Sequence, residues 1–107
     1  MIKGHTEMLI LALLQNTTSM HGYLIRQELT DRSNQIVHPS LGRIYPLLAQ
    51  MQKKSWLKSR PETVCENRVR NTYSITPTGR AELNVRIKKW ELFSAGINRI
   101  LSSCPTK

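Results

Sequence analysis

The chain has 107 residues, the length of one domain, and 39% of them are hydrophobic, as in an ordinary globular protein. Its 16 lysines and arginines against seven acidic residues give a net charge of +9, which favours a polyanionic partner, either nucleic acid or an anionic membrane surface. The two cysteines, Cys65 and Cys104, are too few and too far apart for a disulfide framework or a metal site, so we expect reduced thiols.

The first predicted element is a helix from Thr6, a suitable N-cap, to Gln15. Its central run "MLILALL" is apolar on nearly all sides, so we expect it to be buried on more than one side. This run is much shorter than the about 20 residues of a membrane span. It also lacks a signal-peptide layout, because Glu7 precedes it and no small-residue cleavage site follows. We therefore expect a cytoplasmic protein without membrane association.

A second helix is predicted from Met20 to Arg32, after the turn-forming run "NTTS", with Ser19 as its N-cap. Three apolar residues are spaced to form its inner face: Leu24, Ile25 and Leu29. The next run, "SNQIVHP", is predicted to be a loop, because a residue that precedes proline is disfavoured in the helical region.

The third predicted helix begins near Ser40 and covers "LGRIYPLLAQMQKK". Proline in its early turns removes only one internal hydrogen bond, and the small Gly42 permits close approach of a partner. The apolar positions recur with helical spacing and are predicted to face the core: Leu41, Ile44, Tyr45, Leu48 and Met51. The opposite face is polar and basic, with Arg43, Pro46, Leu47, Gln50, Lys53 and Lys54.

The pattern then changes to alternation, which predicts two strands, Ser55 to Ser59 and Arg68 to Thr76, joined by a polar loop over residues 60–67. In the second strand, apolar residues (Val69, Tyr73, Ile75) alternate with polar ones (Arg68, Arg70, Thr72, Ser74). Together the strands form an antiparallel hairpin with basic residues at its far end.

The last predicted helix opens with Thr76 as N-cap and Pro77 at the first helical position, and it extends to about Leu101. Its apolar stripe alternates steps of four and three residues, which is typical of a coiled coil: Leu83, Ile87, Trp90, Ser94, Ile97 and Leu101, widened by Phe93 and Ile100. A domain this small cannot bury such a stripe alone. We therefore expect a homodimer, with "MLILALL" supplying the rest of its interface.

Three helices followed by a hairpin predict a mainly α (α+β) fold, a winged helix-turn-helix with a two-stranded β wing and a long C-terminal dimerisation helix. Residues 1–76 form the expected DNA-binding domain, and residues 77–107 form the dimerisation helix and tail. In this fold the third helix enters the major groove of double-stranded DNA. A two-fold dimer places two such helices about 34 Å apart and reads a palindromic operator.

The expected DNA contacts lie mainly on the third helix, with Ser40, Gly42, Arg43 and Tyr45 at the groove and Gln50 and Lys54 further along. Arg68 and Arg70 of the wing are expected to reach the backbone or minor groove, and Tyr23 a phosphate. The alternative is a solvated helix face that happens to be basic.

Three stretches resemble the PadR family of transcriptional regulators: "SMHGYLIRQEL", "SLGRIYPLLAQMQKKSWLKS" and "YSITPTGRAEL". They carry Gly22-Tyr23, the Gly-x-hydrophobic-Tyr-Pro run ending at Pro46, and the hydrophobic-Thr-x-x-Gly-Arg run ending at Arg80. The resemblance covers about Met8 to Leu101. It implies a homodimeric winged-helix repressor in its short form, with one helix after the wing. The wing departs from the family by keeping few arginines, and Ser55 stands where glycine is common.

The resemblance also implies an effector. In several relatives, a tryptophan at the position of Trp90 lines a cavity between the subunits, where flat aromatic ligands stack. Here the surrounding residues are Ile87, Phe93, Ser94 and Ile97, which form apolar walls with one hydroxyl, as in many small-molecule pockets. The alternative is that Trp90 only packs in the dimer interface.

An enzyme is not expected, because no glycine-rich phosphate loop or nucleophile elbow occurs. His5, His21 and His38 are not at metal-ligand spacing with one another or with a cysteine, so we expect no metal and no cofactor. His21 is expected to be a helix cap or surface residue, with a phosphate contact as the alternative. A second candidate function is a winged-helix protein-interaction module that docks an acidic partner and binds no operator.

Overall fold

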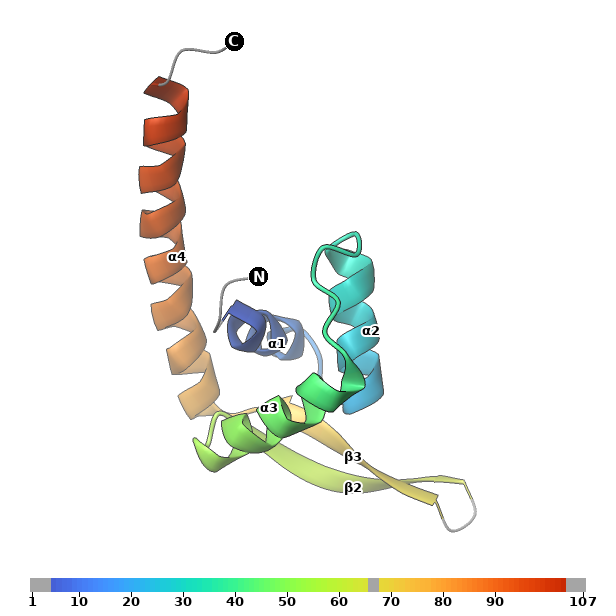
Figure 1. The fold of residues 1–107 in the computed structure, drawn as a ribbon. Helices are drawn as coiled ribbons and strands as arrows, with labels where there is room; N and C mark the ends of the chain where they lie inside the picture. Colours follow the sequence, from blue (N-terminus) through green and yellow to red (C-terminus); the bar gives the residue numbers. More distant parts are fainter. Residues whose placement is uncertain (1–4, 66–67, 104–107) are drawn as a thin grey trace.

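The computed structural model of the chain describes residues 5–65 and 68–103 (Figure 1); Cys104 lies outside these residues. It confirms the mainly helical winged helix-turn-helix fold. The elements follow in the order α1 (His5–Gln15), β1 (Met20–His21), α2 (Gly22–Arg32), α3 (Leu41–Lys53), β2 (Leu57–Cys65), β3 (Arg68–Ile75) and α4 (Pro77–Ser103).

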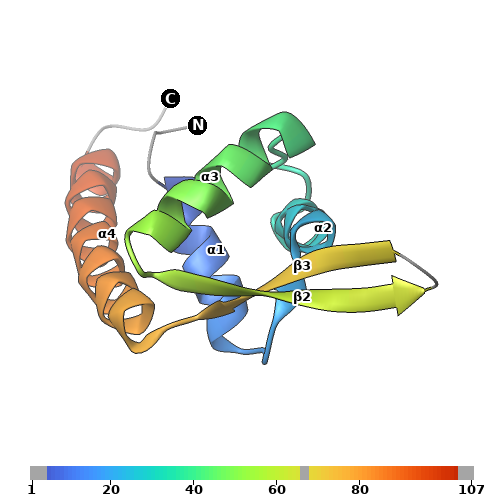
Figure 2. The ribbon, with the colours of Figure 1, turned by 90° about the horizontal axis from the view of Figure 1, so that it is seen from below.

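Helix α1 lies at the centre of the fold, between α4 and α2 (Figures 1 and 2). Ile10, Leu11 and Leu14 are fully buried, because the apolar side chains of this helix point in several directions and each side is covered by another element. The prediction of a first helix buried on more than one side is confirmed. The core around it draws on every element: Leu13, Met20, Ile25, Leu29, Val37, Ile44, Leu48, Met51, Leu57, Tyr73, Ile75 and Leu83.

The start of α2 differs from the prediction. Met20 and His21 form the short strand β1, and His21 rather than Ser19 is the N-cap, with its Nδ1 accepting the backbone N–H of Leu24 at 3.3 Å. A two-residue strand is too short to show any alternation, so the sequence pattern could not reveal it. Ile25 is buried as predicted, but Leu24 on the expected inner face is 37% exposed.

Helix α3 begins after Ser40, whose carbonyl accepts the first helical hydrogen bonds although its hydroxyl caps nothing. The predicted core face is correct for its central members (Ile44, Leu48, Met51), which are fully buried. It is wrong for Leu41 and Tyr45, which are 38% and 46% exposed. These two residues lie at the margins of the stripe, where helical spacing alone does not decide burial.

The hairpin is longer than predicted, since the expected polar loop is mostly strand. β2 pairs with β3 from Leu57↔Ile75 to Cys65↔Arg68, with an irregularity between Thr63 and Cys65. The sheet has the order β1-β3-β2, so Pro61 lies on an edge strand, where a missing N–H is tolerated.

The outer hairpin is exposed on both faces and most of its side chains are polar, so its strands show no regular hydrophobic alternation. The predicted alternation in β3 fails in two places. Val69 is 62% exposed. Thr72 is buried, and its hydroxyl donates to the Arg60 carbonyl at 3.3 Å.

The junction of the hairpin with α3 and α4 explains two features of the sequence: the glycine of the family motif that ends at Arg80, and Ser55 at a position where glycine is common. Ser55 has a φ of 66°, the left-handed conformation that favours the glycine expected there. The Thr76 hydroxyl caps α4 by accepting the Gly79 N–H at 2.9 Å, as predicted, and it also contacts the Ser55 and Trp56 carbonyls. A Cβ on Gly79 would lie 2.2 Å from the Trp56 carbonyl oxygen, so glycine is required there for space.

Helix α4 extends well beyond the other elements (Figure 1), and the molecule measures 62 Å along its longest axis. The structure divides the predicted apolar stripe, because Leu83 is fully buried in the chain's own core and Ile87 is half-buried against it. Most of "MLILALL" is likewise used in this core, with Met8, Leu9 and Ala12 only partly buried. The exposed apolar residues of the outer helix are Trp90, Leu92, Phe93, Ile97, Ile100 and Leu101.

Candidate nucleic-acid interface

The side chains expected to contact DNA are all exposed, and they lie on the start of α2, on α3 and on the hairpin: Tyr23, Ser40, Gly42, Arg43, Tyr45, Gln50, Lys54, Arg68 and Arg70. Seen from below, α3 and the hairpin lie together on the near side of the molecule (Figure 2). The structure thus brings the two predicted reading elements to one face.

The outermost face of α3 is formed by residues that recur at steps of four, three and four: Gly42, Pro46, Ala49 and Lys53, all exposed. Lys53 was predicted to lie on the polar face of the helix but was not among the expected DNA contacts. Residues two apart on a helix differ by about 200°, so Arg43 and Tyr45 flank this face on opposite sides. A partner lying along α3 therefore meets Gly42 and Lys53 directly and Arg43 and Tyr45 from either flank.

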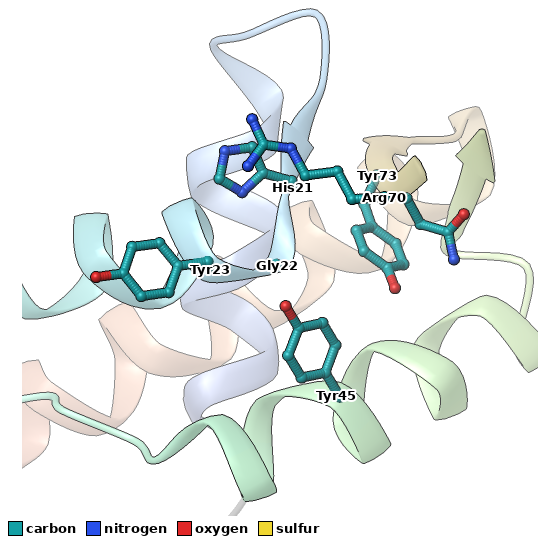
Figure 3. Close-up of a pocket in the computed structure, with 7 residues that line it drawn as sticks. His21, Gly22, Tyr23, Tyr45, Arg70 and Tyr73 are labelled. Carbon is teal, nitrogen blue, oxygen red and sulfur yellow. The ribbon is translucent and has the colours of Figure 1, made fainter. Parts of the chain in front are cut away.

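A pocket of about 380 Å³ opens between the start of α2, α3 and the hairpin (Figure 3). It brings together three of the expected residues, Tyr23, Tyr45 and Arg70, which come from three different elements. Of its other members, only His21 was considered for a DNA contact from the sequence, as an alternative to a cap or surface role. Its lining consists of His21, Gly22, Tyr23, Tyr45, Arg70, Asn71 and Tyr73.

Two of the family motifs meet in this pocket. A Cβ on Gly22 would lie 2.5 Å from Cε1 and 2.9 Å from Cζ of Tyr45, so the tyrosine ring occupies the space that glycine leaves open. Gly22 shows no left-handed φ, and its role is therefore spatial. This contact explains why Tyr45 turns away from the core, and no spacing rule within α3 could have shown it.

Burial in the pocket disfavours the charged forms of two titratable side chains, His21 and Tyr73. Burial lowers the pKa of His21, and the nearby Arg70 guanidinium lowers it further, against a smaller opposite effect of Glu62. Burial raises the pKa of the Tyr73 hydroxyl, as does the proximity of Tyr45, while a hydrogen bond from Asn71 opposes the shift. At neutral pH, His21 is therefore uncharged and the Tyr73 hydroxyl stays protonated.

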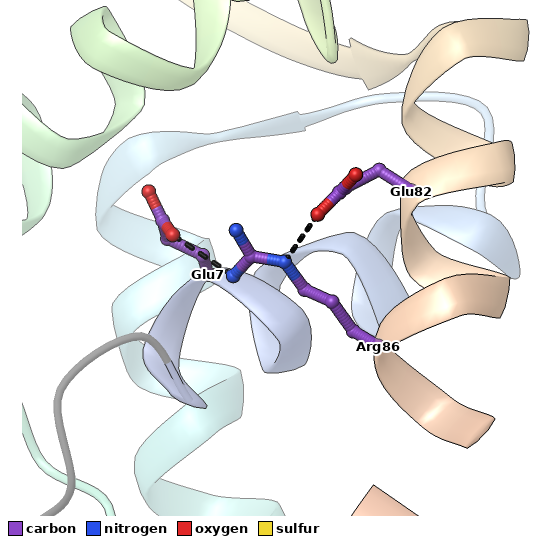
Figure 4. Close-up of polar contacts among 3 residues, drawn as sticks. All are labelled: Glu7, Glu82 and Arg86. Carbon is purple, nitrogen blue, oxygen red and sulfur yellow. Dashed lines mark hydrogen bonds and ion pairs between the residues drawn. The ribbon is translucent and has the colours of Figure 1, made fainter. Parts of the chain in front are cut away.

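Lys54 lies apart from this pocket, at the opposite end of α3. Its Nζ lies 4.7 Å from the centroid of the Trp56 ring, and the guanidinium of Arg86 lies 4.8 Å from the same centroid. Arg86 also binds Glu7 at 2.9 Å and Glu82 at 2.7 Å (Figure 4).

Burial opposes the Arg86 charge, but the hydrogen bonds that the guanidinium donates to the carboxylates of Glu82 and Glu7 outweigh it and raise its pKa. The network joins α1 to α4, and the Trp56 ring connects it to the end of α3. The base of α4 is therefore held against the end of the helix that carries the expected DNA contacts.

The residues expected to surround an effector lie along α4. The Trp90 ring packs edge-on against the His5 imidazole, with centroids 5.0 Å apart, and lies 6.0 Å from the Phe93 ring. The Ser94 hydroxyl donates to the Glu91 carbonyl of its own helix. Trp90, Phe93 and Ile97 are between 39% and 51% exposed, whereas Ile87 contacts the core.

Within residues 5–65 and 68–103, no group of three or more histidine, cysteine or acidic side chains is arranged to hold a metal ion. In the same part of the chain, no helix has the length and hydrophobicity needed to cross a membrane.

Comparison with known proteins agrees with these features. Residues 10–85 match the model of the transcriptional regulator PadR-like family. A transcriptional regulator from Clostridium thermocellum is 26% identical, with a TM-score of 0.83 over 92% of this chain and 94% of that one. A PadR-like transcriptional regulator from Bacillus cereus is 28% identical, with a TM-score of 0.80 over 95% and 96%.

PadR of Bacillus subtilis, whose structure is of a complex with operator DNA, shares the fold with a TM-score of 0.74 at 21% identity. The match covers 81% of this chain and 48% of that longer protein. The family match covers most of the chain and includes all three motifs that carried the resemblance. The chain belongs to the PadR-like family, whose members are transcriptional regulators and not enzymes.

Proposed function

We propose that the protein is a homodimeric, sequence-specific DNA-binding repressor that acts in the cytoplasm on a palindromic operator. The observation that carries this proposal is the exposed face of α3 beside the hairpin, on a chain with a net charge of +9. Residues 1–76 serve as the DNA-binding domain and residues 77–107 as the dimerisation segment. The operator complex of the B. subtilis relative supports this assignment.

The homodimer follows from the exposed apolar side chains of the outer α4. Trp90, Phe93 and Ile97 lie on one side of this helix and project beyond the core, where a second α4 would cover them. Because Leu83 is buried in the chain's own core, the exposed apolar stripe of α4 starts at Trp90. In this proposal only the outer part of α4 therefore forms the dimer interface. Sedimentation equilibrium at micromolar concentration should show a dimer, and a monomer there would contradict the proposal.

Operator binding is tested by fluorescence anisotropy with the DNA upstream of the protein's own gene and with a scrambled duplex of equal length. We expect tighter binding to one duplex sequence and an affinity that falls steeply with salt, because neutralised phosphates release counterions. The second candidate function, a protein-interaction module, predicts no preference between the duplexes. If the upstream DNA holds no operator, selection from a random duplex library shows whether the protein prefers any sequence.

We propose further that a planar aromatic effector binds beside Trp90 and relieves repression. The half-exposed Trp90 ring between His5 and Phe93 supports this, with Ser94 one turn and Ile97 two turns further along α4. A phenolic or planar cationic compound should then quench Trp90 fluorescence and lower operator affinity together.

Trp90→Ala separates the effector site from simple interface packing, because it leaves Trp56 as the remaining tryptophan. The variant should lose the quenching and keep its DNA binding if Trp90 stacks on the effector. Dissociation of the dimer in this variant, with no compound in a screen affecting DNA binding, would show that Trp90 only packs in the interface.

A further inference from the structure

We propose that the pocket between α2, α3 and the hairpin holds one backbone phosphate of the bound DNA, with Arg70 supplying the charge and the His21 Nε2–H and Tyr45 hydroxyl supplying neutral donors. This inference rests on the proposed function and names a partner group for one part of that interface. It selects the phosphate contact that the sequence left as the alternative for His21, and it assigns Arg70 to the backbone rather than to the minor groove.

The donors in this pocket are unused within the described part of the chain. Arg70 lies opposite Glu62 in the register of β2 and β3. Among the described residues, however, the arginines in ion pairs are Arg32 and Arg86, and Arg70 forms none with Glu62. The Tyr45 hydroxyl likewise has no hydrogen-bond partner among those residues, because the ring is positioned by its packing against Gly22. A cation that is in none of these ion pairs and a hydroxyl without a partner among the described residues line the same pocket, which is chemically suited to an anion.

The cap of α2 fixes the tautomer of His21. Its Nδ1 accepts the Leu24 N–H, so in the neutral ring the proton must be on Nε2, which becomes a donor. Figure 3 shows the Arg70 guanidinium beside this ring. The charged and titratable groups around His21 are Arg70 and Glu62 of the hairpin and the tyrosines that line the pocket, Tyr23, Tyr45 and Tyr73. Burial and the Arg70 charge lower the pKa of His21 against the smaller opposite effect of Glu62, which favours the neutral ring.

A DNA phosphate fits this arrangement better than a free phosphate ion. A phosphodiester carries one negative charge, which the single arginine matches, and the remaining donors are neutral. The pocket also lies between the Tyr45 flank of α3 and the hairpin, the two elements proposed to follow the duplex. The N-terminal turn of α2 forms another wall, and backbone N–H groups at a helix N-terminus favour anions.

The test uses operator duplexes that each carry one neutral methylphosphonate linkage, scanned along both strands. At one position in each half-site, the neutral linkage should weaken wild-type binding about tenfold. This is the loss of affinity expected when a hydrogen bond to a charged group is removed. The same linkage should have almost no effect on Arg70→Ala. The matched control is Arg68→Ala, an exposed wing arginine that does not line the pocket and should keep the wild-type sensitivity at that position.

Two further variants separate the neutral donors from structure. Tyr45→Phe keeps the ring against Gly22 and removes the hydroxyl, and His21→Asn keeps a good capping residue and removes the ring donor. Each should weaken operator and scrambled DNA by the same factor without changing the salt slope. Arg70→Ala should reduce the slope of log affinity against log salt by about 0.9. Thermal unfolding confirms that each variant is folded.

If the wild type prefers one duplex sequence but no methylphosphonate position depends on Arg70, the pocket inference is wrong and the proposed function stands. If Tyr45→Phe and His21→Asn both bind as the wild type does, the inference is also wrong. If the wild type prefers no sequence, the proposed function itself fails. Inorganic phosphate titrated into the DNA-free protein, followed by the His21 NMR signals, identifies a free-ion site. If inorganic phosphate saturates the His21 site and no methylphosphonate position depends on Arg70, the assignment of the pocket to a DNA phosphate is wrong.

Discussion

Replacing Gly22 by alanine should place a methyl group against the ring of Tyr45. The added Cβ would lie 2.5 Å from Cε1, 2.9 Å from Cζ and 3.1 Å from the hydroxyl oxygen, all too close for a normal contact. Overpacking of this kind costs about 1–3 kcal/mol. Because Tyr45 is 46% exposed and its ring can turn aside, we expect the lower half of that range.

The same substitution has a favourable part, because alanine is preferred over glycine in a helix by up to about 1 kcal/mol. In a Tyr45→Ala background the collision disappears and only this favourable part remains. We therefore expect Gly22→Ala to destabilise the wild type by about 1 kcal/mol and to be neutral or slightly stabilising beside Tyr45→Ala. The coupling between the two positions should be about 1–2 kcal/mol.

Urea unfolding of the four proteins, wild type, two single variants and the double variant, measures this coupling. Operator affinity, measured on the same samples, should fall in Gly22→Ala because the displaced ring leaves the pocket. The reasoning is refuted if Gly22→Ala changes the free energy of unfolding equally in both backgrounds, within about 0.5 kcal/mol. Tyr45 would then not occupy the space beside Gly22 in solution.

Three further predictions concern stability. Gly79→Ala should lower the free energy of unfolding by about 3 kcal/mol, because its Cβ would meet the backbone carbonyl of Trp56, which cannot turn aside. The control is Gly42→Ala, whose Cβ would have only the serine Oγ at 3.8 Å, and urea unfolding should show no loss. Ser55→Gly should raise the free energy of unfolding by about 0.5–1 kcal/mol, since φ is 66° there, and an unchanged or lower value would contradict this. Because burial and a neighbouring arginine lower the pKa of His21 below its ordinary 6.5, the unfolded chain binds more protons between the two pKa values. Stability should therefore fall as the pH drops below 6.5, and less so in His21→Asn, as urea midpoints on either side of that pH would show.

The sequence was sufficient for those parts of the fold in which local chemistry decides. The Thr76-Pro77 pair places the start of α4 correctly, because capping and the fixed φ of proline act within one turn. The buried stripe of α3 was predicted through Ile44, Leu48 and Met51, since its period matches the helix. The wing was predicted at its core end, where apolar and polar residues alternate.

The pocket was not predicted, because it depends on contacts between residues far apart in the sequence. Gly22 and Tyr45 were both recognised as parts of motifs, but nothing in either motif indicates that they touch. His21 was expected to be a cap or surface residue, and its position beside Arg70 depends on the pairing of β1 with β3. A two-residue strand that brings two polar side chains together leaves no periodic signal.

The central claim, that α3 reads an operator, is tested most directly through Arg43. Its side chain is exposed on the flank of α3 that faces away from the pocket, so Arg43→Ala should leave the fold and the pocket intact. The measurement is the affinity of wild type and variant for the selected operator and for a scrambled duplex at one salt concentration. The exposed Lys88 of α4 provides a control substitution of equal charge. We predict that Arg43→Ala weakens operator binding by about 1–3 kcal/mol more than scrambled binding, while Lys88→Ala changes neither. Unchanged affinity of Arg43→Ala for both duplexes would contradict the assignment of α3 as the reading helix.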